Sequence, residues 1–187
     1  MMAVWFKQRL YMLIGLASIL VIIQLLNALT DGSLTYLGII PRDVRGLIGI
    51  PLSPFLHGSW GHLFSNLPVL LALSALLMIH SIRYYVIASL FIIFTEGILV
   101  WLFGRTAIHI GASGWVFGLW GLLLANAYFL KRIKDLFFAL LVLIYYKGIA
   151  FGLLPWQEYI STEGHIFGAI SGIVFSWMTK KWLITNR

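Results

Sequence analysis

Three short polar clusters interrupt a largely apolar chain and hold the residues that could do chemistry. They are HGSWGHLFSN at 57–66, GASG at 111–114 and GHIFG at 164–168. A serine hydroxyl becomes a useful nucleophile when a base lies beside it, and imidazole, with an ordinary pKa of about 6.5, suits that task. The clusters therefore supply the parts of a hydrolytic site, provided that the fold brings them together.

Composition places these clusters in a membrane protein. Hydrophobic residues make up 61% and charged residues 10% of the 187 residues, and the mean hydropathy is +0.97; these values exclude a soluble domain. A bilayer core about 30 Å thick needs roughly 20 apolar residues per helix. The sequence predicts six transmembrane helices, at about 10–29, 62–82, 84–103, 113–130, 136–154 and 164–180. They nearly exhaust the chain, which indicates one all-α polytopic membrane domain over 1–187.

The first apolar run is long enough to span and lacks a small-residue cleavage site, so no cleavable signal peptide is expected. The basic residues predict the orientation of the spans, because cytoplasmic loops carry an excess of lysine and arginine. The expected outer segments hold only Arg42, Arg45 and Arg105, whereas the inner segments hold Lys7, Arg9, Arg83, Lys131, Arg132, Lys134, Lys180, Lys181 and Arg187. We therefore expect both termini in the cytoplasm.

The net charge of +7 fits this topology and an attraction to anionic lipid. No basic stripe with interleaved aromatic residues occurs in a soluble segment, so a nucleic-acid partner is not expected.

Alternating helices bring the three clusters to one membrane face. The spans that begin near His62, Ser113 and His165 all run inward from the outer side, and Asn66 lies one turn beyond His62 on the same helical face. The helix start at Ser113 offers unpaired backbone N–H groups to a developing oxyanion, and the side chains of His62 and Asn66 could add donors. Three separate sequence features thus become one candidate site.

Glycines near the clusters favour a close approach of two helices. Gly114, Gly118 and Gly121 follow the serine, and Gly164, Gly168 and Gly172 surround the last histidine. Small residues four apart let transmembrane backbones approach closely, as a direct Ser–His contact would require. The same spacing also occurs in ordinary helix packing, so the glycines gain weight only beside the serine and histidine.

These motifs resemble the three signatures of the rhomboid intramembrane serine proteases, in the family's order along the chain. The resemblance implies a six-helix rhomboid bundle with a Ser113–His165 catalytic dyad, an oxyanion hole of His62, Asn66 and the Ser113 N–H, and no cofactor. It further implies cleavage of transmembrane protein substrates near the outer membrane boundary, in a bacterial inner (plasma) membrane. Residues matching the family's supporting positions are Gly111, Gly114, Phe117, Gly168 and His57, the last with a structural role as readily as a catalytic one.

The chain departs from the family pattern at three places. Phe117 stands where the best-studied members carry a tyrosine that stacks on the histidine, and a phenyl ring can still stack. The stretch 77–79 reads Leu-Met-Ile and lacks a glutamate found in many bacterial members, and the first outer loop lacks their Trp-Arg pair. These changes concern local contacts and leave the dyad in place.

Two other function classes remain open. A non-proteolytic rhomboid-like protein that binds membrane clients would share the fold, although such proteins usually lose the serine or histidine. A transporter or proton relay would explain Glu96, Lys147 and the histidines as intramembrane polar groups, but gives no reason for the GASG cluster. Two histidines in 57–66 without any cysteine make a poor zinc site.

The remaining polar residues lead to local predictions. We expect His80 and His109 to be interfacial or capping residues, and residues 30–56 to form a hairpin lying partly in the membrane interface. Residues 155–163 are either a plain connector or a cap over the site. Glu96 and Lys147 lie at similar depths in their spans and could form an ion pair if their helices touch.

Overall fold

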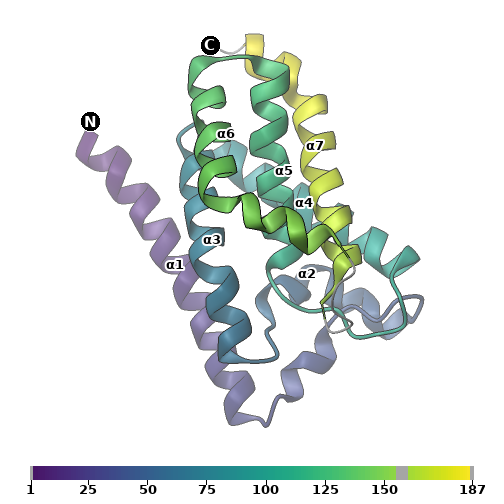
Figure 1. The fold of residues 1–187 in the computed structure, drawn as a ribbon. Helices are drawn as coiled ribbons and strands as arrows, with labels where there is room; N and C mark the ends of the chain where they lie inside the picture. Colours follow the sequence, from purple (N-terminus) through teal and green to yellow (C-terminus); the bar gives the residue numbers. More distant parts are fainter. Residues whose placement is uncertain (1, 155–159, 186–187) are drawn as a thin grey trace.

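The computed structural model describes residues 2–154 and 160–185 as a bundle of helices (Figure 1). In these ranges it contains seven α-helices and no strand. The helices are α1 (Met2–Leu29), α2 (Gly49–Leu52), α3 (Trp60–Met78), α4 (Ile82–Phe103), α5 (Ser113–Leu130), α6 (Ile133–Tyr146) and α7 (Thr162–Thr185). Short 3₁₀ segments lie at Ser33–Leu37, Val44–Ile48, Ser53–Phe55 and Lys147–Leu153.

Every predicted span corresponds to a helix, with different ends. The helix expected at 62–82 stops at Met78, because the Ser81 hydroxyl accepts the Tyr84 N–H and caps a new helix. The expected span 136–154 is only partly α-helical: α6 ends at Tyr146, and the chain continues as a 3₁₀ segment containing Gly148 and Gly152, since glycine is a poor helix former.

Four helices of the described ranges, α1, α3, α4 and α5, are long and apolar enough to cross a membrane. An architecture with six spans therefore stays a prediction. The long helices alternate in direction, so that α3, α5 and α7 all begin at the same end of the bundle, while α1 begins and α7 ends toward the opposite end (Figure 1).

Among the described helices, α5 and α7 share the most extensive contact. Gly168 of α7 faces the Gly114 carbonyl, Gly172 faces the Gly118 carbonyl, and a Cβ at Gly121 would lie 2.6 Å from the Ala169 carbonyl oxygen. No larger residue fits at these three glycines without moving the partner backbone. The close approach predicted from the glycine spacing is thus confirmed.

The segment between α1 and α3 packs against the chain that leads into α5. Ile39 forms an isolated antiparallel bridge with His109, and Ser53 accepts a hydrogen bond from the Gly111 N–H at 2.9 Å. Exposed apolar side chains on this segment include Tyr36, Val44 and Ile48. Its predicted place in the membrane interface stays a prediction, but its contacts fix the chain immediately before Ser113.

Candidate active site

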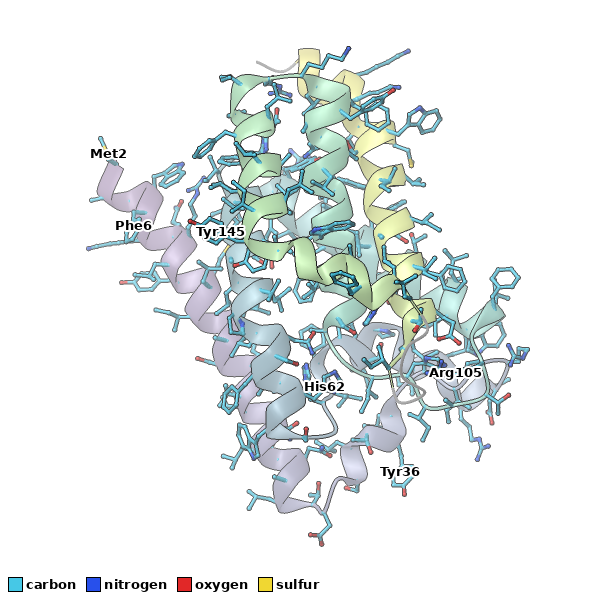
Figure 2. All side chains as sticks on the ribbon, in the orientation of Figure 1. Met2, Phe6, Tyr36, His62, Arg105 and Tyr145 are labelled. Carbon is cyan, nitrogen blue, oxygen red and sulfur yellow. The ribbon has the colours of Figure 1, made fainter. Side chains whose placement is uncertain are left out.

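A cavity of about 760 Å³ lies at the end of the bundle where α3, α5 and α7 begin. Its lining includes Ser113, His165, His62 and Asn66, the four residues singled out from three distant parts of the sequence. Figure 2 shows His62 and Arg105, another residue of the lining, at this end of the molecule. The fold therefore brings the predicted site residues together around one space.

Ser113 is the first residue of α5, where backbone N–H groups have no partner within the helix. The preceding turn is shaped by Gly111, whose φ of +114° is one that residues with a side chain rarely adopt. A Cβ at Gly111 would stand 2.7 Å from two atoms of the His62 ring. The glycine thus lets the His62 imidazole lie against the backbone that leads into Ser113.

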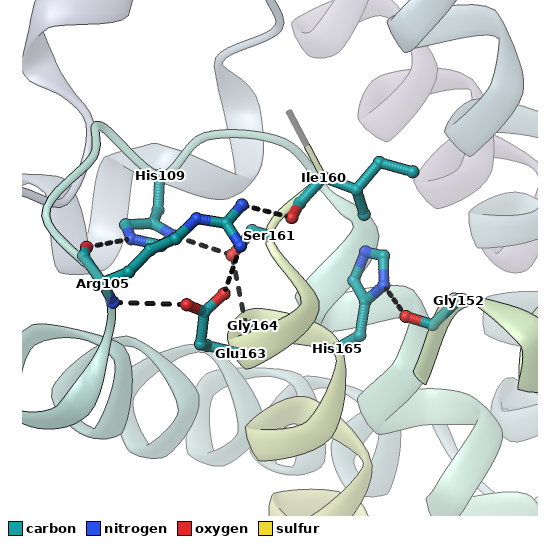
Figure 3. A network of polar contacts seen from close by, with 8 residues as sticks. All are labelled: Arg105, His109, Gly152, Ile160, Ser161, Glu163, Gly164 and His165. Atoms are coloured by element: carbon teal, nitrogen blue, oxygen red, sulfur yellow. Dashed lines mark hydrogen bonds and ion pairs between the residues drawn. The ribbon is translucent and has the colours of Figure 1, made fainter. Parts of the chain in front are cut away.

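His165 is held from two sides in the first turns of α7. Its ring stacks on Phe117, with ring centroids 4.1 Å apart and planes inclined by 13°. Its Nδ1 lies 2.7 Å from the carbonyl oxygen of Gly152 (Figure 3). Because a carbonyl oxygen can only accept, Nδ1 must carry a proton, and in the neutral ring Nε2 is then an acceptor. A base for a serine hydroxyl needs this tautomer.

The Gly152 carbonyl was not anticipated from the sequence. It takes the place that a carboxylate occupies in Ser-His-Asp sites, where the third group holds the imidazole in the correct tautomer. It reaches His165 because the chain after α6 tightens into a 3₁₀ segment. A backbone carbonyl has no side-chain signature, so only the two glycines at the end of the predicted span could have suggested an irregular stretch there.

Asn66 lies one turn below His62 on α3, as predicted. Its amide donates one hydrogen bond to the His62 carbonyl at 2.9 Å, and an amide nitrogen carries two protons. One N–H therefore remains for a group in the cavity. The start of this helix is capped by Ser59, whose hydroxyl accepts the His62 N–H at 3.1 Å.

His57 supports the backbone beside the site. It is 1% exposed, its Nε2 accepts the Ala112 N–H at 3.4 Å, and its ring meets His62 edge-on at 4.9 Å between centroids. Burial, together with the charge that His62 can carry, lowers the pKa of His57 from 6.5 to about 4. A neutral imidazole suits an acceptor held against a backbone N–H.

Two further polar residues have contacts that the sequence did not indicate. The His80 side chain is 3% exposed and lies 3.0 Å from an Asp135 carboxyl oxygen at the opposite end of the bundle, where it gives the buried carboxylate a partner; its interfacial depth stays a prediction. The Glu96 carboxyl lies beside Gly114 and Gly164. The Lys147 side chain lies outside the described part of the structure, as do residues 155–159, so the ion pair with Glu96 and the cap over the site stay predictions.

Comparison with known proteins identifies the family of the chain. The family model for the Rhomboid domain matches residues 44–182. The chain is 32% identical over 170 residues to the uncharacterized protein Mb1372 of Mycobacterium bovis, a match that covers 86% of this chain and 71% of that protein. It is 31% identical over 170 residues to the uncharacterized protein ML1171 of Mycobacterium leprae, covering 86% and 67%.

Proposed function

The chain belongs to the rhomboid family, and we propose that it is an intramembrane serine endopeptidase with Ser113 as nucleophile and His165 as base. The observation that carries this proposal is the Nδ1 contact of His165 with the Gly152 carbonyl at 2.7 Å. It leaves Nε2 as an acceptor on a ring that lines the same cavity as Ser113. The family and the apolar helices indicate an integral membrane protein.

In the proposed reaction the Ser113 oxygen attacks the carbonyl carbon of a peptide bond while its proton passes to His165 Nε2. The tetrahedral oxyanion accepts hydrogen bonds from the Ser113 N–H and from the side chains of His62 and Asn66. The C–N bond then breaks, and the departing amine takes the proton from His165. Water, deprotonated by the same imidazole, then attacks the acyl carbon; the ester bond to Ser113 breaks, His165 returns the proton to the serine oxygen, and the acyl group leaves as a carboxylic acid.

The substrate would be a transmembrane protein cut near the outer membrane boundary. With six spans and both termini in the cytoplasm, the ends of α3, α5 and α7 that carry the cavity face outward. The lining there mixes apolar side chains such as Val69 and Ile110 with the polar candidates. Such a cavity suits an extended peptide whose backbone must leave its own helix before it can be cut.

Labelling of the purified protein with a fluorophosphonate probe tests this proposal. Wild-type protein should be labelled, whereas Ser113→Ala and His165→Ala should not be labelled and should not cleave a model transmembrane substrate. Ser65→Ala is a matched control, because Ser65 lines the same cavity and its hydroxyl is bonded to the His62 carbonyl; it should be labelled normally. A folded wild-type protein that neither labels nor cleaves would instead favour a non-proteolytic client-binding protein.

A further inference from the structure

A cluster of polar groups joins the connection between α4 and α5 to the first turn of α7 (Figure 3). His109 lies at its centre, four residues before Ser113, and is 5% exposed. Across the cluster lie Ser161, Glu163 and Gly164, immediately before His165. The cluster therefore links the two segments that carry the proposed nucleophile and base.

The hydrogen bonds of His109 form a directed chain. Its Nε2 lies 3.0 Å from the Arg105 carbonyl oxygen, which can only accept, so Nε2 carries the proton. In the neutral ring Nδ1 is then an acceptor, and the Ser161 hydroxyl, 2.7 Å away, donates to it. The same hydroxyl oxygen accepts the Gly164 N–H at 3.2 Å. His109 thus orients the serine that caps the helix of His165.

The backbone of His109 is fixed independently of its side chain. Its N–H donates to Ile39 at 2.9 Å and its carbonyl accepts from Ile39 at 3.0 Å. Two residues later, the Gly111 N–H is bonded to Ser53. These hydrogen bonds hold the backbone that carries the His109 side chain. The His109 ring therefore gives the start of α7 a defined position relative to the turn before Ser113.

A second contact, between Arg105 and Glu163, joins the same two segments, but solvent exposure makes it weaker than the contact between His109 and Ser161. The Arg105 guanidinium lies 3.5 Å from the Glu163 carboxyl, with the arginine side chain 38% exposed. The Arg105 backbone N–H also donates to Glu163 at 3.3 Å. Ion pairs with this exposure contribute little, so the shorter, part-buried contact between His109 and Ser161 is the one expected to hold the helix.

We propose that His109 is a positioning residue which, through Ser161, sets the first turn of α7 and thereby the place of the His165 imidazole relative to Ser113. This proposal rests on the proposed protease function. The helices themselves are held together by the glycine contacts of α5 and α7, so loss of the link should disturb alignment more than folding. Misalignment by about 1 Å can slow a reaction by about 10²-fold.

Substitutions on both sides of the contact test the proposal. His109→Leu removes both ring nitrogens, and Ser161→Ala removes one oxygen. Each should lower kcat for a model transmembrane substrate by about tenfold or more with little change in KM, and the double variant should be no worse than the poorer single one. His109→Asn, which keeps an acceptor near the position of Nδ1, should recover much of the loss. Thr106→Ala, an exposed site in the same connection, should behave as wild type.

Two outcomes would overturn the positioning role: wild-type kcat in both His109→Leu and Ser161→Ala, or losses that add in the double variant. A wild-type protein without Ser113-dependent turnover would instead refute the protease function. In that case the rate of amide hydrogen exchange at Gly164 still tests whether His109 holds the first turn of α7 through Ser161. Faster exchange in His109→Leu than in Thr106→Ala would support it, and equal exchange would refute it.

Discussion

A carboxyl oxygen of Glu96 packs against Gly114, only 2.6 Å from the position that a Cβ would take there. The same oxygen lies 3.0 Å from the corresponding position at Gly164. These glycines directly follow Ser113 and precede His165. A side chain of α4 therefore fills the space between the two segments that carry the proposed dyad, and its place there depends on glycine at both positions.

The first prediction concerns a methyl group added at Gly114, beside the Glu96 carboxyl. Gly114→Ala should lower the thermal stability of the protein in detergent and slow its labelling by a serine probe, because the new methyl collides with the carboxyl. Adding Glu96→Ala to the same chain should restore part of both losses by opening that space.

Gly15→Ala is the control for this experiment, since a Cβ at Gly15 meets nothing within 4 Å. Wild-type stability and labelling in Gly114→Ala would show that the carboxyl does not need the space beside the glycine.

The second prediction concerns the proposed oxyanion donors. Asn66→Ala should slow substrate turnover, by at most the factor of about 10²–10³ that a single donor supplies elsewhere, because the Ser113 N–H and His62 would remain. Probe labelling should stay detectable and the unfolding temperature close to that of wild type. If Asn66→Ala failed to fold, the hydrogen bond from Asn66 to the His62 carbonyl would be needed for the stability of the helix, and Asn66 would be a structural residue.

The third prediction concerns the ring that stacks on the proposed base. Phe117→Tyr keeps an aromatic face against His165 and should retain kcat, whereas Phe117→Leu should lower it about tenfold or less, the value of a typical aromatic pair. Steady-state kinetics on one substrate compare the variants, with KM expected to change little. Equal kcat in Phe117→Leu and wild type would show that the Gly152 carbonyl alone orients the imidazole.

The fourth prediction concerns stability in acid. The pKa of His57 is about 4 in the folded protein, below its ordinary value, so the unfolded chain takes up a proton first as the pH falls. Stability should therefore be full above about pH 6.5 and decline toward pH 4, by at most about 1.4 kcal/mol per pH unit from this group. Thermal unfolding of wild type and His57→Gln across this range measures it. The variant should show a shallower decline, and an identical slope would assign the acid sensitivity to other groups.

The sequence alone predicted most of the architecture. Long apolar runs must form helices in a bilayer, since every backbone polar group needs a partner within its own segment, and each predicted span corresponds to a helix. Alternation of these helices then predicted that His62, Ser113 and His165 share one end. The paired glycines predicted the close approach of α5 and α7, because this depends on residue size and helical spacing, both visible in the sequence.

Tertiary structure decided how the individual groups meet. The Gly152 carbonyl reaches His165 only because α6 ends early, and the Glu96 carboxyl reaches Gly114 from a different helix. His109 was expected at the interface or as a cap, and the fold buries it beside Ser161, the serine at the start of α7. These contacts join residues far apart in sequence and follow no helical period. They depend on helix ends and backbone groups, which only the packed fold positions.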